Sequence, residues 1–205
     1  MSAPHPAPAL PPALAEAAAE AAGCRRCPLW AHATQAVFGE GPARAAMMLV
    51  GEQPGDQEDI QGRPFVGPAG QVLDRALREA GVRRSTVYVT NAVKHFKYVP
   101  RGKRRIHQKP DGGEIAACRF WLDIELAEIK PLVTVALGAT AARAVLGRAV
   151  TIGRERGRPI PLLGQGSVMV TVHPSYLLRL PDEEAKRREY AAFVADLRQA
   201  AALVG

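Results

Sequence analysis

The sequence predicts a three-layer α/β/α protein, in which helices cover a central, mostly parallel four-stranded sheet. Four short apolar runs alternate along the chain with segments of helical periodicity. Strands joined through helices pair in parallel, and the helices then cover both faces of the sheet. With 205 residues, 47% of them hydrophobic and 23% charged, the chain has the size and composition of one globular domain. We expect this domain over residues 12–205, after a flexible, Pro/Ala-rich stretch over 1–11.

Each expected strand is a short apolar or β-branched run, as is typical of the middle of a buried sheet. The first run, AAMMLVG, is apolar throughout, and the second, TVYVTNAV, is rich in β-branched residues. The strands are expected over residues 45–51, 86–93, 132–138 and 168–172.

The helices are predicted by apolar residues that recur every three or four positions. Val72, Leu73, Ala76 and Leu77 share one face of a helix that Gly81 ends. The helices are expected over residues 12–22, 69–80, 114–129, 139–146 and 182–204.

Positive charge is in excess and concentrated in one segment. The chain has 27 Lys and Arg against 20 Asp and Glu, for a formal net charge of +7. Residues 94–109, KHFKYVPRGKRRIHQK, hold seven of these basic residues and no acidic one, interleaved with Phe96, Tyr98 and His107. Basic and aromatic side chains together favour contacts with phosphates and bases, so nucleic acid is the expected partner. A solvated basic loop is the alternative.

Several other classes of protein are disfavoured by the sequence. No run of about 18 apolar residues could span a membrane, and the start of the chain lacks the pattern of a secretory signal. We therefore expect a cytoplasmic protein, and nothing in the sequence requires more than a monomer. Three cysteines make a disulfide framework improbable in that compartment. Cys24 and Cys27 form a Cys-x-x-Cys pair far from Cys118, which is compatible with either metal binding or a redox pair.

Polar side chains follow three of the expected strands. Glu52 and Gln53 come after the first, Asn91 ends the second and His173 follows the fourth. Ligands of parallel α/β sheets bind beyond the carboxyl ends of the strands, so these groups are expected to form one site. The Gly/Pro-rich loop over residues 51–70 would add a backbone-lined pocket, and it lacks the lysine of a phosphate-binding loop.

The segments GEQPGDQED, GRPFVGPAG and HPSYLLR, together with Asn91, resemble the uracil-DNA glycosylase superfamily, specifically its iron–sulfur, family-4-like members. The resemblance extends from about Cys24 to the last helix. The GEQPG form, the NAVKHFK segment and the inserted GKRRIHQ resemble one branch more closely, the uracil-DNA-binding UdgX proteins.

The resemblance implies a pocket for a uracil flipped out of DNA. Asn91 would bind uracil O4 and N3–H, Phe65 would stack on the ring and His173 would donate to O2. Glu52 would give electrostatic or base assistance. Gln53 and Asp56 would be polar supports.

The same resemblance implies that His107 attacks C1′ of the sugar and stays attached, so that each molecule acts once. Lys103, Arg104 and Arg105 would hold their loop against DNA phosphates. The alternatives are that His107 merely contacts a phosphate, that the protein is an ordinary turnover glycosylase, or that it is a non-catalytic iron–sulfur DNA-binding module.

A four-ligand metal site is also implied. His95 stands where family-4 proteins carry a cysteine, so Cys24, Cys27, His95 and Cys118 would hold a [4Fe–4S] cluster. Structural zinc would suit the same ligands. The alternating arginines of GRERGRP, over residues 153–159, would form either the solvent face of a strand or part of a DNA groove.

Overall fold

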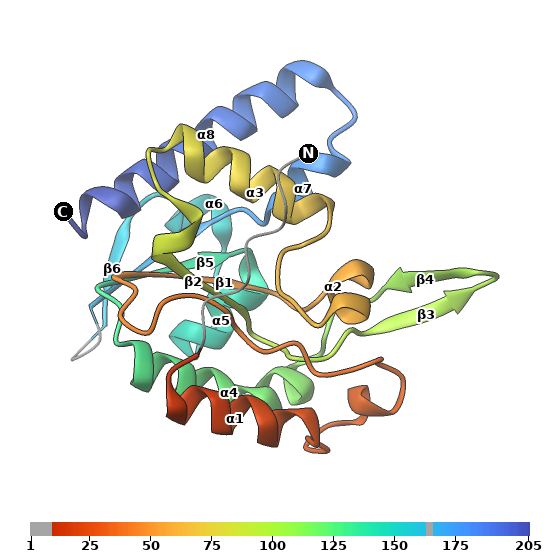
Figure 1. Ribbon diagram of the computed structural model, residues 1–205. Helices are drawn as coiled ribbons and strands as arrows, with labels where there is room; N and C mark the ends of the chain where they lie inside the picture. Colours follow the sequence, from red (N-terminus) through yellow and green to blue (C-terminus); the bar gives the residue numbers. More distant parts are fainter. Residues whose placement is uncertain (1–9, 163–165) are drawn as a thin grey trace, which may run out of the picture.

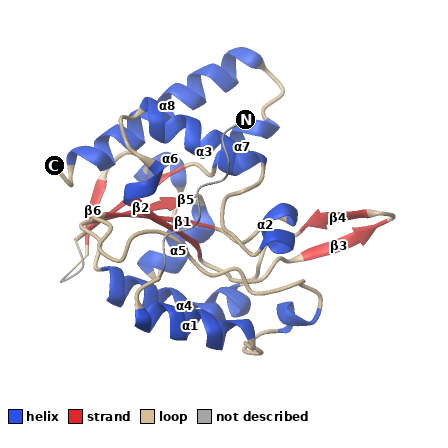
Figure 2. Ribbon diagram, viewed as in Figure 1, coloured by secondary structure: helices blue, strands red, loops and turns tan. Residues whose placement is uncertain are grey.

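The computed structural model describes residues 10–162 and 166–205, and its core is one five-stranded sheet (Figures 1 and 2). The strand order is β2-β1-β5-β7-β6. The first four pair in parallel, and β6 is antiparallel to β7. The strands are β1 (Met47–Gly51), β2 (Val87–Asn91), β5 (Val133–Leu137), β6 (Pro159–Pro161) and β7 (Ser167–Thr171).

Helices cover both faces of this sheet, which confirms the predicted α/β/α class. Met48 and Val50 of β1 pack with α1, α4 and α5, whereas Met47 and Leu49 pack with α3, α7 and α8. The two faces therefore bury alternate residues of the same strand. The helices are α1 (Pro12–Ala22), α2 (Asp56–Gln61), α3 (Pro68–Glu79), α4 (Gly112–Ile129), α5 (Ala139–Leu146), α6 (Ile152–Glu155), α7 (Pro174–Arg179) and α8 (Glu183–Ala202), with 3₁₀ turns at Pro28–Ala31 and Arg84–Thr86.

The expected strands and long helices lie within two residues of their observed bounds, but the sheet has one strand more than predicted. The extra strand, β6, has three residues, two of them prolines, so it shows no alternating pattern. Proline is tolerated there because β6 is an edge strand. The expected flexible stretch over 1–11 falls mostly outside the described residues. In the described part of the chain, no helix has the length and apolar character needed to cross a membrane.

The basic segment over residues 94–109 forms a β-hairpin, β3 (Tyr98–Arg101) and β4 (Arg104–His107), that projects from the body of the protein (Figure 1). Gly102, at a φ of 60°, occupies the turn. The register pairs Tyr98 with His107, so His107 lies at the base of the hairpin, next to the sheet. The sequence alone gave this segment no regular structure.

The alternating arginines do not form the solvent face of a strand. Arg154 lies in α6, and Arg156 makes an isolated bridge to Val170. The Arg156 side chain turns inward to ion pairs with Asp196 (2.7 Å) and Glu189 (2.6 Å) of α8. The alternation of arginines predicted a strand here, and this prediction is wrong because the single helical turn of α6 occupies the first part of the segment.

Candidate active site

A cavity of about 810 Å³ opens at the carboxyl edge of the sheet. It is bounded by the ends of β1, β2, β5 and β7, by α6 and α7, and by the base of the hairpin. Six of the predicted site residues line it, namely Glu52, Gln53, Phe65, Asn91, His107 and His173. Asp56, Lys103, Arg104 and Arg105 are not among its lining residues.

At the end of β1, the backbone of Gly51 lies directly against the side chains of Asn91 and Phe65, which line the cavity. A Cβ at Gly51 would lie 2.3 Å from Asn91 Oδ1 and 2.7 Å from the Phe65 ring, so glycine is required there. Phe65 has a φ of 57°, which is uncommon for a bulky residue. A Cβ at Gly70 would lie 1.8 Å from the Phe65 carbonyl oxygen, so the next turn packs directly against this strained residue. The Phe65 ring is stacked near His173, with centroids 6.2 Å apart.

Glu58, to which the sequence analysis gave no role, holds the loop that carries Phe65. The side chain is buried, and its two oxygens accept hydrogen bonds from Gly55 N (3.1 Å) and Gly67 N (2.9 Å). The available signal was the position of Glu58 three residues after Gly55, from which its carboxylate accepts the N–H of the N-cap residue of α2, as the glutamate of a capping box does.

His173 presents a buried donor to the cavity. Its Nδ1 accepts a hydrogen bond from Ser175 N (3.1 Å), which assigns the ring proton to Nε2. That Nε2 is buried and has no hydrogen-bond partner among residues 10–162 and 166–205. Burial lowers the pKa of His173 to about 4, and Arg179 and His107 contribute to the shift. The imidazole is therefore neutral at physiological pH and can donate to a ligand oxygen.

His107 and Glu52 face each other at the cavity. Nε2 of His107 lies 3.4 Å from Oε1 of Glu52, and the His107 side chain is half exposed. Burial lowers the pKa of His107 despite the opposing attraction of Glu52, and Arg179 lowers it further. The imidazole is thus held neutral, which is the nucleophilic form. The other oxygen of Glu52 accepts a hydrogen bond from the Thr140 hydroxyl.

Gln53 ties the base of the hairpin to the end of β1. Its Nε2 donates to the carbonyls of Lys97 (3.2 Å) and Gln108 (3.0 Å), and its Oε1 accepts from Lys97 N (3.1 Å). One buried amide therefore holds both ends of the hairpin. These bonds engage both Oε1 and Nε2 of Gln53 and hold Gln108, the neighbour of His107, in place.

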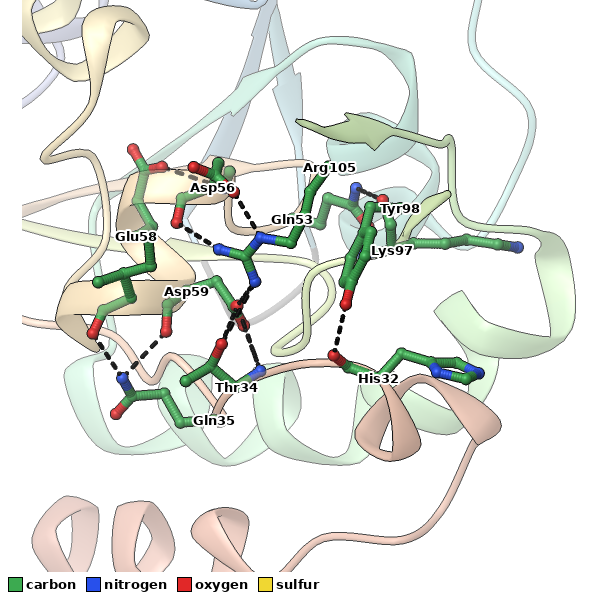
Figure 3. A network of polar contacts seen from close by, with 12 residues as sticks. His32, Thr34, Gln35, Gln53, Asp56, Glu58, Asp59, Lys97, Tyr98 and Arg105 are labelled. Carbon is green, nitrogen blue, oxygen red and sulfur yellow. Dashed lines mark hydrogen bonds and ion pairs between the residues drawn. The ribbon is translucent and has the colours of Figure 1, made fainter. Parts of the chain in front are cut away.

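Arg105 forms the second attachment of the hairpin (Figure 3). Its guanidinium binds Asp56 Oδ1 (2.6 Å) and Asp59 Oδ2 (2.5 Å) of α2 and lies over the rings of Phe96 and Tyr98. Asp56 and Arg105 are therefore paired with each other, and neither lines the cavity.

The hairpin tip, by contrast, carries unburied cations. Lys103 and Arg104 are exposed, as is Arg101 beside them. Of the three residues expected to contact DNA phosphates, two are thus presented to solvent.

The four expected metal ligands come from three segments: Cys24 and Cys27 follow α1, His95 follows β2 and Cys118 lies in α4. Cys24 Sγ accepts a hydrogen bond from Trp121 Nε1 and Cys118 Sγ accepts one from Lys94 N, both at 3.2 Å. Burial raises the pKa of Cys118 to about 11, and nearby Cys27 and Cys24 add to the shift.

His95 completes this set of donors. It is buried and lines a small cleft with Cys24, and its Nδ1 has no hydrogen-bond partner among the residues that the structure describes. Three thiols and an imidazole are donors of the types that bind iron–sulfur clusters and zinc. In the described part of the chain, no three His, Cys, Asp or Glu side chains are close enough to hold one metal ion.

A buried ion pair joins the cysteine region to the cavity. Lys94 Nζ lies 2.6 Å from Glu125 Oε2 and donates to the Asn91 carbonyl at 2.8 Å, and both charged groups are essentially unexposed. The Lys94 backbone N–H binds Cys118, so one residue connects the end of β2 with α4. The basic run had predicted side chains that contact nucleic acid or face solvent, so a buried, ion-paired lysine at this position was not foreseen.

The chain is similar to known proteins over most of its length. Residues 38–198 match a family model described as the uracil DNA glycosylase superfamily. A type-4 uracil-DNA glycosylase of Thermotoga maritima is 45% identical over 80% of this chain and 82% of its own length. Proteins of the same description from Pyrobaculum aerophilum and Archaeoglobus fulgidus are 39% and 35% identical, over 77% and 82% of this chain and 81% and 82% of their own lengths. The matched range includes every predicted residue that lines the cavity.

Proposed function

The chain belongs to the uracil DNA glycosylase superfamily and within it to the type-4 family, and we propose that it excises uracil from DNA and stays covalently attached through His107 to C1′ of the abasic site. The observation that carries this proposal is a neutral imidazole 3.4 Å from the Glu52 carboxylate at the mouth of the cavity. Single-stranded DNA is the preferred substrate in this proposal, because an unpaired base is extruded at the lowest cost.

Uracil is read by three groups at the end of the sheet. The Asn91 amide offers a donor and an acceptor, which match uracil O4 and N3–H. Phe65 provides the stacking surface, and His173 Nε2 provides the donor for O2. The orphaned Nε2 of His173 supports this assignment, because a buried donor without a partner is stabilised when a ligand oxygen satisfies it.

Cleavage and capture form one balanced displacement. The bond between C1′ and uracil N1 breaks with its electron pair leaving on uracil, whose developing charge at O2 faces His173. The imidazole nitrogen of His107 that carries the lone pair then bonds to C1′. The proton on the other ring nitrogen is lost to a base, for which Glu52 is the adjacent carboxylate. The product is a neutral alkylated imidazole, which has no easy route to hydrolysis.

The cysteine and histidine donors are proposed to hold a [4Fe–4S] cluster. Cys24, Cys27, His95 and Cys118 would be its ligands, and when bound it would supply a structural crosslink. These residues join the N-terminal segment to α4 and to the end of β2. Such a crosslink would hold Asn91, at the end of β2, and the base of the hairpin in a fixed position relative to α4.

The direct test is a labelled single-stranded oligonucleotide with one uracil, incubated with the protein, boiled in SDS and run on a denaturing gel. We expect a shifted band that is absent when thymine replaces uracil. An unshifted strand that alkali cleaves at the uracil would refute capture and establish turnover. A strand intact after alkali would refute excision as well and leave a DNA-binding module.

A further inference from the structure

The two oxygens of the Glu52 carboxylate have different partners. Oε1 faces His107 Nε2 at 3.4 Å, whereas Oε2 accepts a hydrogen bond from the Thr140 hydroxyl. The Glu52 side chain keeps about a fifth of its exposure, so without a second contact it could rotate into the cavity. The hydroxyl bond therefore selects the rotamer in which the free oxygen faces the histidine.

Thr140 is placed rigidly for this task. It is 3% exposed, lies in the first turn of α5 and lines the cavity. The preceding Gly138 has a φ of 92°, and a Cβ there would lie 3.2 Å from the Cβ of His173. The turn from β5 into α5 thus passes close to β7 and brings Thr140 to the end of β1. A threonine in a helix has two favoured χ1 rotamers, and in the one observed here the hydroxyl donates to Glu52.

We propose that Thr140 is a positioning residue for the reaction at C1′, acting through Glu52 on His107. This inference rests on the proposed function, and it assigns Thr140 no contact with the substrate or with His107. Its hydroxyl fixes the carboxylate oxygen that orients the imidazole. Losing such a fixed geometry slows a reaction even when every reacting group is still present.

Two pairs of variants isolate the hydroxyl group. Thr140→Val exchanges it for a methyl of similar shape, and Thr140→Ser and Thr140→Ala differ from each other only by the hydroxyl. Single-turnover crosslinking is measured with rising concentrations of protein over a uracil-containing oligonucleotide, which separates the maximal rate from the half-saturating concentration. Thermal unfolding of every variant is recorded alongside.

We expect Thr140→Val and Thr140→Ala to lower the maximal rate about tenfold, with half-saturation unchanged. Thr140→Ser should stay within about twofold of the unmodified protein. Adding Thr140→Val to Glu52→Gln should slow the reaction no further, because the hydroxyl acts only through the carboxylate. A general packing defect would instead lower the melting temperature, and its loss of rate would multiply with the loss caused by Glu52→Gln.

Unchanged maximal rates in both hydroxyl-free variants would overturn the inference, as would multiplicative losses in the double variant. If the unmodified protein releases uracil without a crosslink, capture fails as a function, and the action of Thr140 on His107 fails with it. If it releases no uracil, excision fails and the inference fails with it. Unchanged rates in the variants of a protein that does form the crosslink would overturn the inference alone.

Discussion

Replacing Arg105 with alanine should loosen the β3–β4 hairpin and slow covalent capture. The guanidinium is 21% exposed and pairs with Asp59, which is fully buried, and with Asp56, which is 44% exposed. Removing one partner of a buried pair costs about 3–5 kcal/mol, whereas an exposed pair contributes at most about 1 kcal/mol. Asp59 keeps hydrogen bonds from Thr34 N and Oγ1, which moderates the loss.

The expected loss for docking of the hairpin is therefore about 2 kcal/mol, which is equivalent to about 30-fold in a rate constant that requires the docked state. We expect capture at saturating protein to slow by about 10- to 30-fold. Release of uracil should slow much less, because Asn91, Phe65 and His173 are held by the sheet and the loop after it.

The assay follows crosslink formation and free uracil in the same quenched samples. Arg104→Ala is the matched control, since Arg104 is the exposed neighbour on β4. It should weaken DNA binding and reduce the dependence of log affinity on log salt by about one, with the crosslinking rate at saturation retained. Capture by Arg105→Ala at the unmodified rate, or a reduced salt dependence equal to that of Arg104→Ala, would show that Arg105 binds phosphate and does not fasten the hairpin.

Three further predictions follow from the site. His107→Ser should abolish the crosslink on denaturing gels while uracil is still released to water, and a persistent crosslink would exclude His107 as the attachment point. Because burial lowers the pKa of His173 to about 4 from about 6.5, the unfolded state binds the extra proton between these values, so folding stability is complete above pH 6.5 and falls by about 3 kcal/mol as the pH drops to 4. Denaturant unfolding should reveal this slope, reduced in His173→Asn, and equal slopes in the two proteins would contradict the assignment. Protein purified without oxygen should be brown and contain iron and sulfide, with less of both in Cys118→Ser, whereas colourless protein with zinc would overturn the cluster.

The sequence predicted those parts of the fold and site that depend on local patterns. Apolar runs located four strands, and because parallel strands end at one edge, Glu52, Asn91 and His173 could be expected to converge. The attachments of the hairpin could not be foreseen in this way. Arg105 and Asp59 are 46 positions apart, and a run of basic residues gives no sign of which one is paired inside the protein. Thr140 was missed for the same reason, since its partner lies 88 positions away.

The site residues fall into two groups according to the part of the fold that holds them, and substitutions in the two groups should affect activity differently. Asn91, Phe65 and His173 are fixed by the sheet and its adjoining loop, whereas His107 reaches the cavity from a hairpin held by Gln53 and by Arg105. Changes in the first group should reduce release and capture together, because no abasic sugar forms without base recognition.

Changes in the hairpin group should reduce capture alone and leave a protein that behaves as a turnover glycosylase. Glu52 belongs to both groups, since it adjoins the reacting sugar in the proposed mechanism and faces His107. Of the residues that face His107, Glu52 is thus the one at which a conservative change, Glu52→Gln, should slow both the appearance of free uracil and the appearance of the crosslink. Loss of capture alone in that variant would restrict Glu52 to orienting the histidine and would leave stabilisation of the sugar cation to the backbone of the Gly51–Gly70 loop.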